Sequence, residues 1–185
     1  MNVYDFDHTI YDGDCTLDFY FLCIKRHSKV LLSLPNSVKY MILYMMHACS
    51  REKFKEVFYS FLAYVPEIDR EIEKFWDKNE RKIKKFYLEQ SKEDDLIISA
   101  SPEFLIENIC CRLEVCYIAS KVDKNDGKLL GPNCRGEEKV KEFKKRYPEG
   151  KIEKFYSDSY SDIFLARISD AAFKVSGNKI VKMIT

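Results

Sequence analysis

A short N-terminal strand, followed at once by acidic residues and then by a long helical block, most constrains how this chain folds. Asn2 to Tyr4 can form a strand, and the acid-rich residues 5–9 follow it directly. From Cys15 to about Ser91 the pattern is helical. From Arg51 to Val65, for example, apolar residues recur at spacings of three and four. After Ser91, short apolar runs alternate with helical segments. This alternation predicts a mostly parallel sheet with helices on both faces.

We therefore expect an α/β protein with a Rossmann-like core made of residues 1–14 and 91–185, and an all-helical cap inserted as residues 15–90. Ser101 is expected to cap a helix whose first residue is Pro102, and Asp126-Gly127 is typical of a hairpin turn. The expected core strands are 96–98, 115–119, 151–156, 171–175 and 179–183, and the expected core helices are 102–112, 136–147 and one from the acidic turn 157–162 to Ile168. In the cap, the expected helices are 18–25, 37–46, 51–65 and a segment over 68–87.

Charge and cysteine content bear on the partners. The 31 Lys and Arg residues nearly balance the 30 Asp and Glu residues, so no net field favours a nucleic-acid partner. The seven cysteines are odd in number and form no C-x-x-C pair, which favours free thiols in a reducing compartment. The N-terminus also lacks the pattern of a signal peptide. We therefore expect a cytoplasmic protein.

An apolar segment from Val30 to Met46 resembles a membrane helix in composition only. Pro35-Asn36 interrupts it and Lys39 lies in its middle, and its longest unbroken apolar run is far shorter than the roughly 20 residues that a span needs. We expect no membrane span here, and instead a buried or groove-lining helix of the cap.

The acids after the first strand indicate a cation site. Side chains two apart on a strand point the same way, so Asp5 and Asp7 are expected to meet. Like charges at that distance are costly unless a cation or a proton lies between them, and a divalent metal is the natural inference. For Asp12 and Asp14, ordinary turn formation is an equally good explanation.

Polar residues also follow the other predicted strands. Ligands of open α/β sheets bind at the carboxyl ends of the strands, and independent segments place hydroxyl and carboxyl groups there. Lys139 is on the predicted inward stripe of its helix through its i+4 relation to Phe143, so it is expected to reach the same edge. The polar residues at this edge are Asp5, Asp7 and Thr9, then Ser99 and Ser101, and finally Asp158 and Asp162.

These segments resemble, in order and approximate spacing, the four motifs of the haloacid dehalogenase-like hydrolase superfamily. The motifs are Asp5-x-Asp7-x-Thr9, the strand ending in Ser99, Lys139, and the acidic run from Ser157 to Asp162. The chain looks most like the phosphoserine phosphatase-like subgroup, in which a helical cap follows the first motif. Ser157 stands where that family often has Gly.

The resemblance implies a Mg²⁺-dependent phosphatase acting on a small-molecule phosphate ester. In it, Asp5 is the nucleophile that becomes an aspartyl phosphate and Asp7 is the general acid and base. The resemblance further implies that Mg²⁺ binds Asp5, the main-chain carbonyl of Asp7 and Asp158, and that Ser99 and Lys139 bind the phosphoryl group. Thr9 and Asp162 have supporting roles, with Asp162 orienting Lys139 or a metal-bound water.

Two alternatives to a phosphatase remain open at this stage. Asp7 argues against a dehalogenase, because halide leaves without a proton. A non-catalytic or signalling module that binds Mg²⁺ or phosphate without turnover is the main rival, and a sugar-nucleotide transferase is a weaker one. The leaving group, the oligomeric state and any contact of Asp12, Asp14 or Thr16 with substrate are not determined by the sequence.

Overall fold

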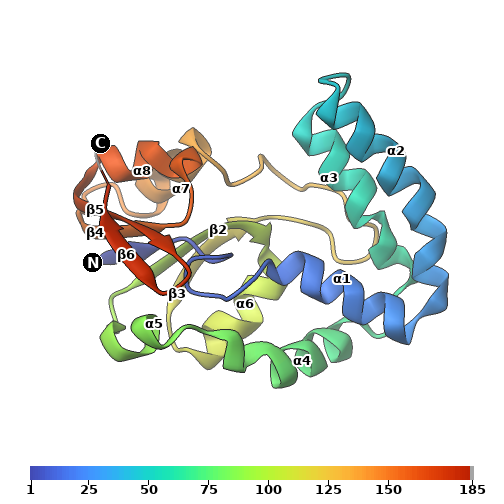
Figure 1. The fold of residues 1–185 in the computed structure, drawn as a ribbon, viewed down its shortest axis with the longest axis horizontal. Helices are drawn as coiled ribbons and strands as arrows, with labels where there is room; N and C mark the ends of the chain where they lie inside the picture. The colour runs from blue at the N-terminus through green and yellow to red at the C-terminus, as the bar shows by residue number, and fades with distance from the viewer. Residues whose placement is uncertain (184–185) are drawn as a thin grey trace.

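The computed structural model describes residues 1–183 and has a six-stranded sheet in the order β3-β2-β1-β4-β5-β6 (Figure 1). Strands β1 to β5 are parallel, and β6 is antiparallel to β5. The α/β fold class predicted from the alternation of strands and helices is therefore confirmed. The strands are β1 (Asn2–Tyr4), β2 (Leu96–Pro102), β3 (Cys116–Ser120), β4 (Ile152–Ser157), β5 (Ser169–Ser176) and β6 (Lys179–Lys182).

Helices cover both faces of the sheet because successive strand residues point to opposite sides. Val3 of β1 packs in one hydrophobic cluster with α7 (Glu137–Arg146) and α8 (Ile163–Arg167). The next residue, Tyr4, packs in a second cluster that contains side chains of α6 (Glu103–Arg112). In Figure 1, α7 and α8 lie above the sheet and α6 lies below it.

The inserted block divides into two parts. In Figure 1, α2 and α3 form a pair that stands away from the sheet, whereas α4 and α5 run beneath it. The indole Nε1 of Trp76 donates to the carbonyl of Leu105 at 2.9 Å, and the ring of Tyr87 meets Tyr4 edge-on at 5.0 Å. The expected domain limits of the cap stay a prediction, since α4 and α5 share a core with β1. The helical segments are α1 (Cys15–Arg26), α2 (Leu34–Met45), α3 (Arg51–Tyr59), α4 (Ile68–Asn79) and α5 (Lys85–Gln90), with 3-10 turns at Ser28–Ser33, Ser60–Tyr64, Glu80–Lys82 and Tyr160–Asp162.

The prediction that Ser101 is the N-cap residue of α6 is wrong. Ser101 and Pro102 belong to β2, and the helix begins at Glu103 with no side-chain capping bond. The hydroxyl of Ser101 instead donates to Asp7. The Ser-Pro pattern favours a helix start here, but the hydrogen bond of Ser101 to Asp7, which is distant in sequence, keeps Ser101 in the strand.

The predicted hairpin at Asp126-Gly127 is reduced to a turn closed by a single bridge between Val122 and Leu129. Gly127 has a φ of +79°, and a Cβ atom there would lie 2.4 Å from the carbonyl oxygen of Tyr59. The turn therefore packs directly on the backbone of the cap, and its glycine is required both by the backbone conformation and by the close approach.

Helix α2 is largely exposed, so of the two expected arrangements, buried or groove-lining, only the second is met, through Met41, which lines the cavity described below. Pro35 lies in its first turn rather than before it, where a proline fits because the first N–H groups have no intrahelical partner. The sole residue of α2 that is fully buried is Ser37. Among residues 1–183 no helix has the length and apolar character that crossing a membrane requires.

Candidate active site

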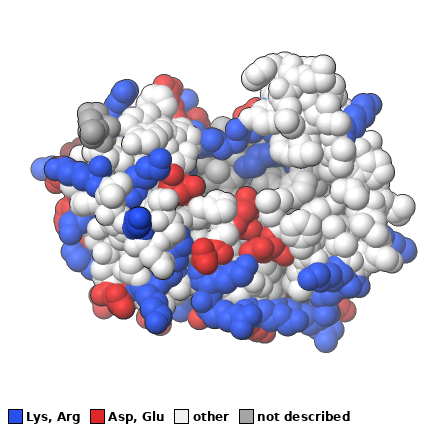
Figure 2. All heavy atoms as spheres, in the orientation of Figure 1, with Lys and Arg blue, Asp and Glu red and all other residues white. Residues whose placement is uncertain are grey.

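A cavity of about 510 Å³ lies between the carboxyl edge of the sheet and the inserted helices. Figure 2 shows the molecule hollowed here, with acidic and basic atoms gathered in the hollow. The first strand delivers Asp5 to this edge, because the amide of Asp5 still donates to the carbonyl of Tyr156 in β4 at 2.9 Å. The charged residues lining the cavity are Asp5, Asp7, Asp14, Asp158 and Asp162, together with Arg51, Lys55, Arg135 and Lys139.

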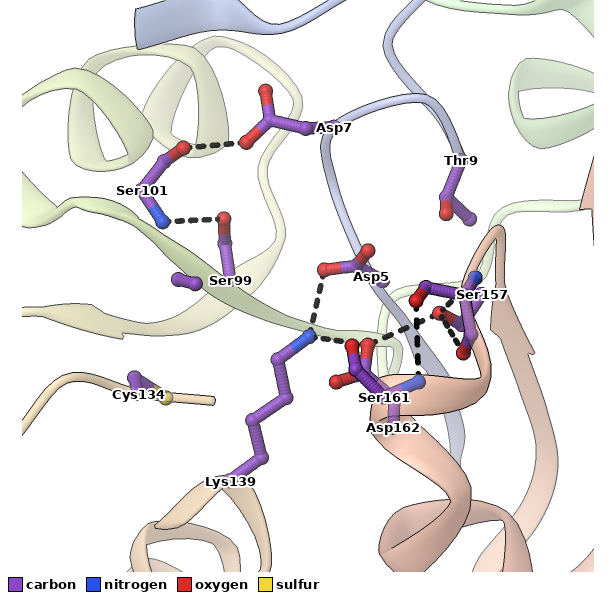
Figure 3. Close-up of polar contacts among 12 residues, drawn as sticks. Asp5, Asp7, Thr9, Ser99, Ser101, Cys134, Lys139, Ser157, Ser161 and Asp162 are labelled. Atoms are coloured by element: carbon purple, nitrogen blue, oxygen red, sulfur yellow. Dashed lines mark hydrogen bonds and ion pairs between the residues drawn. The ribbon is translucent and has the colours of Figure 1, made fainter. Parts of the chain in front are cut away.

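Lys139 connects two of the acids at the base of this cavity. Its Nζ donates to Oδ1 of Asp5 and to Oδ2 of Asp162, both at 2.7 Å (Figure 3). The side chain is buried, with 1% of the residue exposed. It comes from the first turn of α7, whose buried stripe continues at Phe143. Lys139 therefore lies on the buried side of this amphipathic helix, together with its apolar side chains.

Around Lys139 the carboxyl groups outnumber the ammonium group. Burial alone would lower the pKa of Lys139, but the carboxylates of Asp5 and Asp162 outweigh it and raise that pKa. Burial raises the pKa of Asp5 to about 7, against the lowering effect of Lys139. One buried ammonium thus faces two buried carboxyl groups, and the local excess of negative charge is unfavourable in a low dielectric.

Asp7 lies in the same cavity but has different partners. Its Oδ1 accepts from the backbone amide of Cys15 at 2.7 Å, and its Oδ2 accepts from the hydroxyl of Ser101. Burial and the charge of Asp14 raise the pKa of Asp7. In Figure 3 the carboxyl group of Asp5 turns toward Lys139, whereas that of Asp7 turns toward Ser101. The two side chains therefore share a cavity without sharing a partner.

Of the remaining residues expected at the site, Asp158 lines the cavity, whereas Ser99 and Thr9 are buried behind its lining. The hydroxyl of Ser99 accepts from the amide of Ser101 at 3.0 Å, and Ser99 is buried behind the cavity lining rather than part of it. The hydroxyl of Thr9 accepts from the amide of Asp158 at 2.9 Å and so joins the first acidic loop to the last one. Burial raises the pKa of Asp158, which lines the cavity.

Ser157 takes part in the network from the position where the resembling family often has glycine. Its hydroxyl donates to Oδ2 of Asp162 at 3.0 Å. Asp162 thereby accepts from both Ser157 and Lys139 at one oxygen, while its buried Oδ1 has no hydrogen-bond partner within residues 1–183. The serine thus helps to fix the carboxyl group that holds the lysine.

A family model for haloacid dehalogenase-like hydrolases matches residues 3–167. The chain belongs to this family. The matched region includes every residue of the Asp5, Asp7, Lys139 and Asp162 network described above. A search of curated proteins gives no match.

Solved structures share the fold of this chain at low sequence identity. A protein of unknown function from Bordetella pertussis Tohama I has a TM-score of 0.70 and 19% identity, with 90% of this chain and 85% of that one covered. A phosphoserine phosphohydrolase-like protein from Francisella tularensis subsp. tularensis SCHU S4 has a TM-score of 0.57, 16% identity, and coverage of 93% and 86%. A phosphoserine phosphatase in its apo form has a TM-score of 0.51, 18% identity, and coverage of 92% and 82%.

The donor set of this haloacid dehalogenase-like hydrolase fits a hard divalent cation that retains waters. Among residues 1–183 no three His, Cys, Asp or Glu side chains gather closely enough to hold a metal by themselves. Mg²⁺ does not require this, since it usually binds through one or two carboxylates plus oxygen donors and several waters. Asp5 and Asp158 line one cavity, and burial disfavours the charged form of both. A cation here would offset that cost.

The basic residues Arg51, Lys55 and Arg135, which also line the cavity, were not predicted from the sequence. Lys55 of α3 reaches across to the core, where its Nζ donates to the carbonyl of Ala100 at 2.7 Å and to the side chain of Asn133. Burial, then the neighbouring Arg51, lowers the pKa of Lys55 to about 8. Nothing in the helical pattern of α3 distinguishes Lys55, because it is outside the apolar stripe. Its hydrogen bonds from α3 to Ala100 and Asn133 form only in the tertiary fold.

Proposed function

We propose that this hydrolase is a Mg²⁺-dependent phosphatase that acts on a small-molecule phosphomonoester through an aspartyl phosphate on Asp5. The observation that carries the proposal is the different environment of its two cavity acids. Asp5 is paired with the buried Lys139, whereas Asp7 is held by Ser101 and a backbone amide. Pairs of acids with unlike surroundings are a general means of dividing nucleophilic and acid-base roles.

In the first step, an oxygen of Asp5 attacks phosphorus and the bond from phosphorus to the leaving oxygen breaks. Asp7 gives its proton to that leaving oxygen. The raised pKa of Asp7, caused by burial and by Asp14, supports this role because it favours the protonated acid. The hydrogen bond from Ser101 restricts the direction in which Asp7 points, so we assign Ser101 as its positioning residue.

In the second step, water attacks the aspartyl phosphate and Asp7 takes a proton from it. The phosphorus–Asp5 bond breaks, and phosphate and the free carboxylate of Asp5 are released. This division of one displacement into two is the general advantage of a covalent intermediate. Asp7 ends the cycle protonated, as it began.

We propose that Lys139 binds the phosphoryl group directly and that Ser99, which is buried behind the cavity lining, supports the site through its hydrogen bond with the amide of Ser101. The ammonium of Lys139 has three donors, of which Asp5 and Asp162 use two, and the third is available for a phosphoryl oxygen. Mg²⁺, held by Asp5, Asp158 and the main-chain carbonyl of Asp7, would neutralise charge on the transferring group. The lining residues of α3 lie on the opposite side of the cavity, which favours a small-molecule ester over a macromolecule. A cytoplasmic location is proposed from the sequence pattern alone.

The test is release of inorganic phosphate by the purified chain. The panel includes amino-acid, sugar, choline-type and nucleoside phosphates, each with Mg²⁺ and with Mg²⁺ removed by a chelator. We expect hydrolysis of at least one ester, lost on chelation and restored by added Mg²⁺. Stable phosphorylation of Asp5 without release of phosphate would instead support the non-catalytic module. Absence of both products over the whole panel would overturn the proposal.

A further inference from the structure

Helix α2 presents its apolar side chains outward. Its inner side is formed by Ser37, which is buried, and by Tyr44, which stacks on Phe54 of α3 at 5.6 Å. The outward residues follow one helical stripe at spacings of three and four. They are Leu34, Val38, Met41, Ile42 and Met45, which are 39%, 40%, 43%, 49% and 71% exposed. An apolar stripe left in solvent while a serine is buried is the reverse of the usual arrangement.

This stripe is continuous with the mouth of the cavity. Met41 belongs to the stripe and also lines the cavity. From the neighbouring helix α1, Leu17 lines the cavity in the same way, and the exposed Phe21 follows it one turn later. The 3-10 turn before α2 adds the exposed residues Leu31 and Leu32. Together these residues form what we call the α1–α2 apolar surface, and the cavity opens beside it.

The segment that carries all of this surface except Leu17 has charged side chains of one sign only. No Asp or Glu occurs between Asp18 and Glu52, although 30 of the 185 residues of the chain are acidic. Within that stretch Lys25, Lys29 and Lys39 are exposed, and none of them forms an ion pair within residues 1–183. In Figure 2 the part of the molecule that carries α2 shows neutral and basic atoms at its outer edge.

We infer that the α1–α2 apolar surface docks on an anionic lipid bilayer. Exposed apolar side chains flanked by lysines, on a helix too short to span a membrane, are the features of an interfacial element. The lysines match the negative surface potential of such a bilayer. A second copy of this chain is a poorer occupant, because a symmetric contact would bring the same lysines together with no acid in the segment to pair with them.

Docking would place the cavity mouth at the lipid surface. If the phosphatase proposed above acts there, its substrate is a phosphomonoester carried by a lipid, with the phosphate at Asp5 and the apolar part along Leu17 and Met41. This second statement rests on the proposed function, whereas docking does not. The two are therefore tested by separate measurements on the same protein.

Docking is tested by sedimentation of the full chain with phosphatidylcholine vesicles that contain or lack phosphatidylglycerol. We expect binding to the anionic vesicles to be on the order of a hundred-fold tighter, since each of three lysines near such a surface contributes about 1 kcal/mol. High salt is expected to remove most of this difference through screening. Absence of binding to the anionic vesicles would overturn the inference.

A matched pair of variants locates the docking surface. Ile42→Glu with Met45→Glu places two acids on the stripe, away from the cavity lining, and is expected to abolish vesicle binding. Leu88→Glu with Val181→Glu makes the same change at two residues that are 53% and 56% exposed elsewhere, and is expected to preserve binding. Equal losses in both, or a dimer of the unaltered chain that the first variant separates into monomers, would contradict membrane docking.

Activity then separates the substrate claim from docking. With a soluble ester, the Ile42→Glu and Met45→Glu variant is expected to keep its kcat, whereas hydrolysis of phosphatidic acid in anionic vesicles is expected to fall at least about tenfold, in proportion to the lost binding. Vesicle binding without any hydrolysis of phosphatidic acid would reject the lipid substrate alone. Loss of hydrolysis on every ester would reject the proposed function and leave docking intact.

Discussion

Replacing Asp5 with Asn is expected to lower the kcat of phosphate release by at least about 10⁴-fold, as loss of a covalent nucleophile does in other hydrolases. The amide cannot form the aspartyl phosphate, yet it has nearly the shape of the carboxylate and its oxygen can still accept from Lys139. The fold is expected to remain intact. The measurement is initial rate with Mg²⁺, accompanied by thermal unfolding of the same preparations.

The pH dependence of stability gives this variant a second signature. Burial raises the pKa of Asp5 to about 7 in the Mg²⁺-free folded chain, above the value near 3.9 of an unfolded aspartate. The folded state therefore binds the proton more tightly, and the stability this supplies is present at low pH and lost as the pH rises through about 7. Asp5→Asn is expected to be more stable than the unaltered chain at pH 8 and to lose that advantage toward pH 4.

Asp12 supplies the control for both measurements. It is an acid of the same loop, but it is exposed and does not line the cavity. Asp12→Asn makes the same chemical change and is expected to keep activity within about twofold, as surface substitutions away from special sites generally do. If Asp5→Asn kept activity comparable to that of Asp12→Asn, Asp5 could not be the nucleophile.

The sequence predicted the parts of this molecule that depend on period and order. Alternation of strands and helices was sufficient to predict the parallel sheet. Polar residues at strand ends were sufficient to predict that Asp5 lies near Asp158, since the carboxyl ends of parallel strands share an edge. The helical spacing of Lys139 and Phe143 placed a lysine among buried side chains. Each of these rules acts over a few residues or follows from topology.

The residues that were wrongly predicted or not predicted at all depend on contacts between distant segments. Ser101 and Pro102 have the local pattern of a helix start, but Ser101 is 94 residues from the Asp7 that it contacts, and no local rule identifies that pair. Lys55 is unremarkable on its helix and becomes a link to the core only when α3 lies over the cavity. Helix α2 was expected to be buried or to line a groove, but most of its apolar side is exposed. Composition alone does not reveal which face a helix presents to its neighbours.

Removing the ammonium of Lys139 is expected to have the largest effect on stability. In Lys139→Met an apolar chain of similar length leaves the buried carboxyl groups of Asp5 and Asp162 without their shared cation. Breaking a buried ion pair in this way costs about 3–5 kcal/mol. The measurement is urea unfolding of the Mg²⁺-free protein at pH 8, and phosphate release is expected to be lost as well.

Two further measurements show whether lost charge pairing or lost packing destabilises Lys139→Met: the pH dependence of its stability, and the effect of replacing its partner Asp162. Without Lys139 the pKa of Asp5 loses its main lowering influence, so Asp5 takes up a proton at higher pH and the destabilisation is expected to be smaller at pH 5. Adding Asp162→Asn removes one of the stranded charges and is expected to recover part of the lost stability. A loss that is independent of pH and unrelieved by Asp162→Asn would mean that packing, not charge, accounts for it.

Lys141 on the same helix is the matched control, since its Nζ lies 3.1 Å from Glu138 on an exposed face. Such surface pairs contribute about 0–1 kcal/mol, so Lys141→Met is expected to change stability little and to leave activity unaltered. The contrast matters because α7 carries several lysines of similar sequence context. If Lys139→Met behaved as Lys141→Met does, the buried lysine would be neither the counter-ion of Asp5 nor a phosphate ligand, and the acidic cavity would require a different source of positive charge.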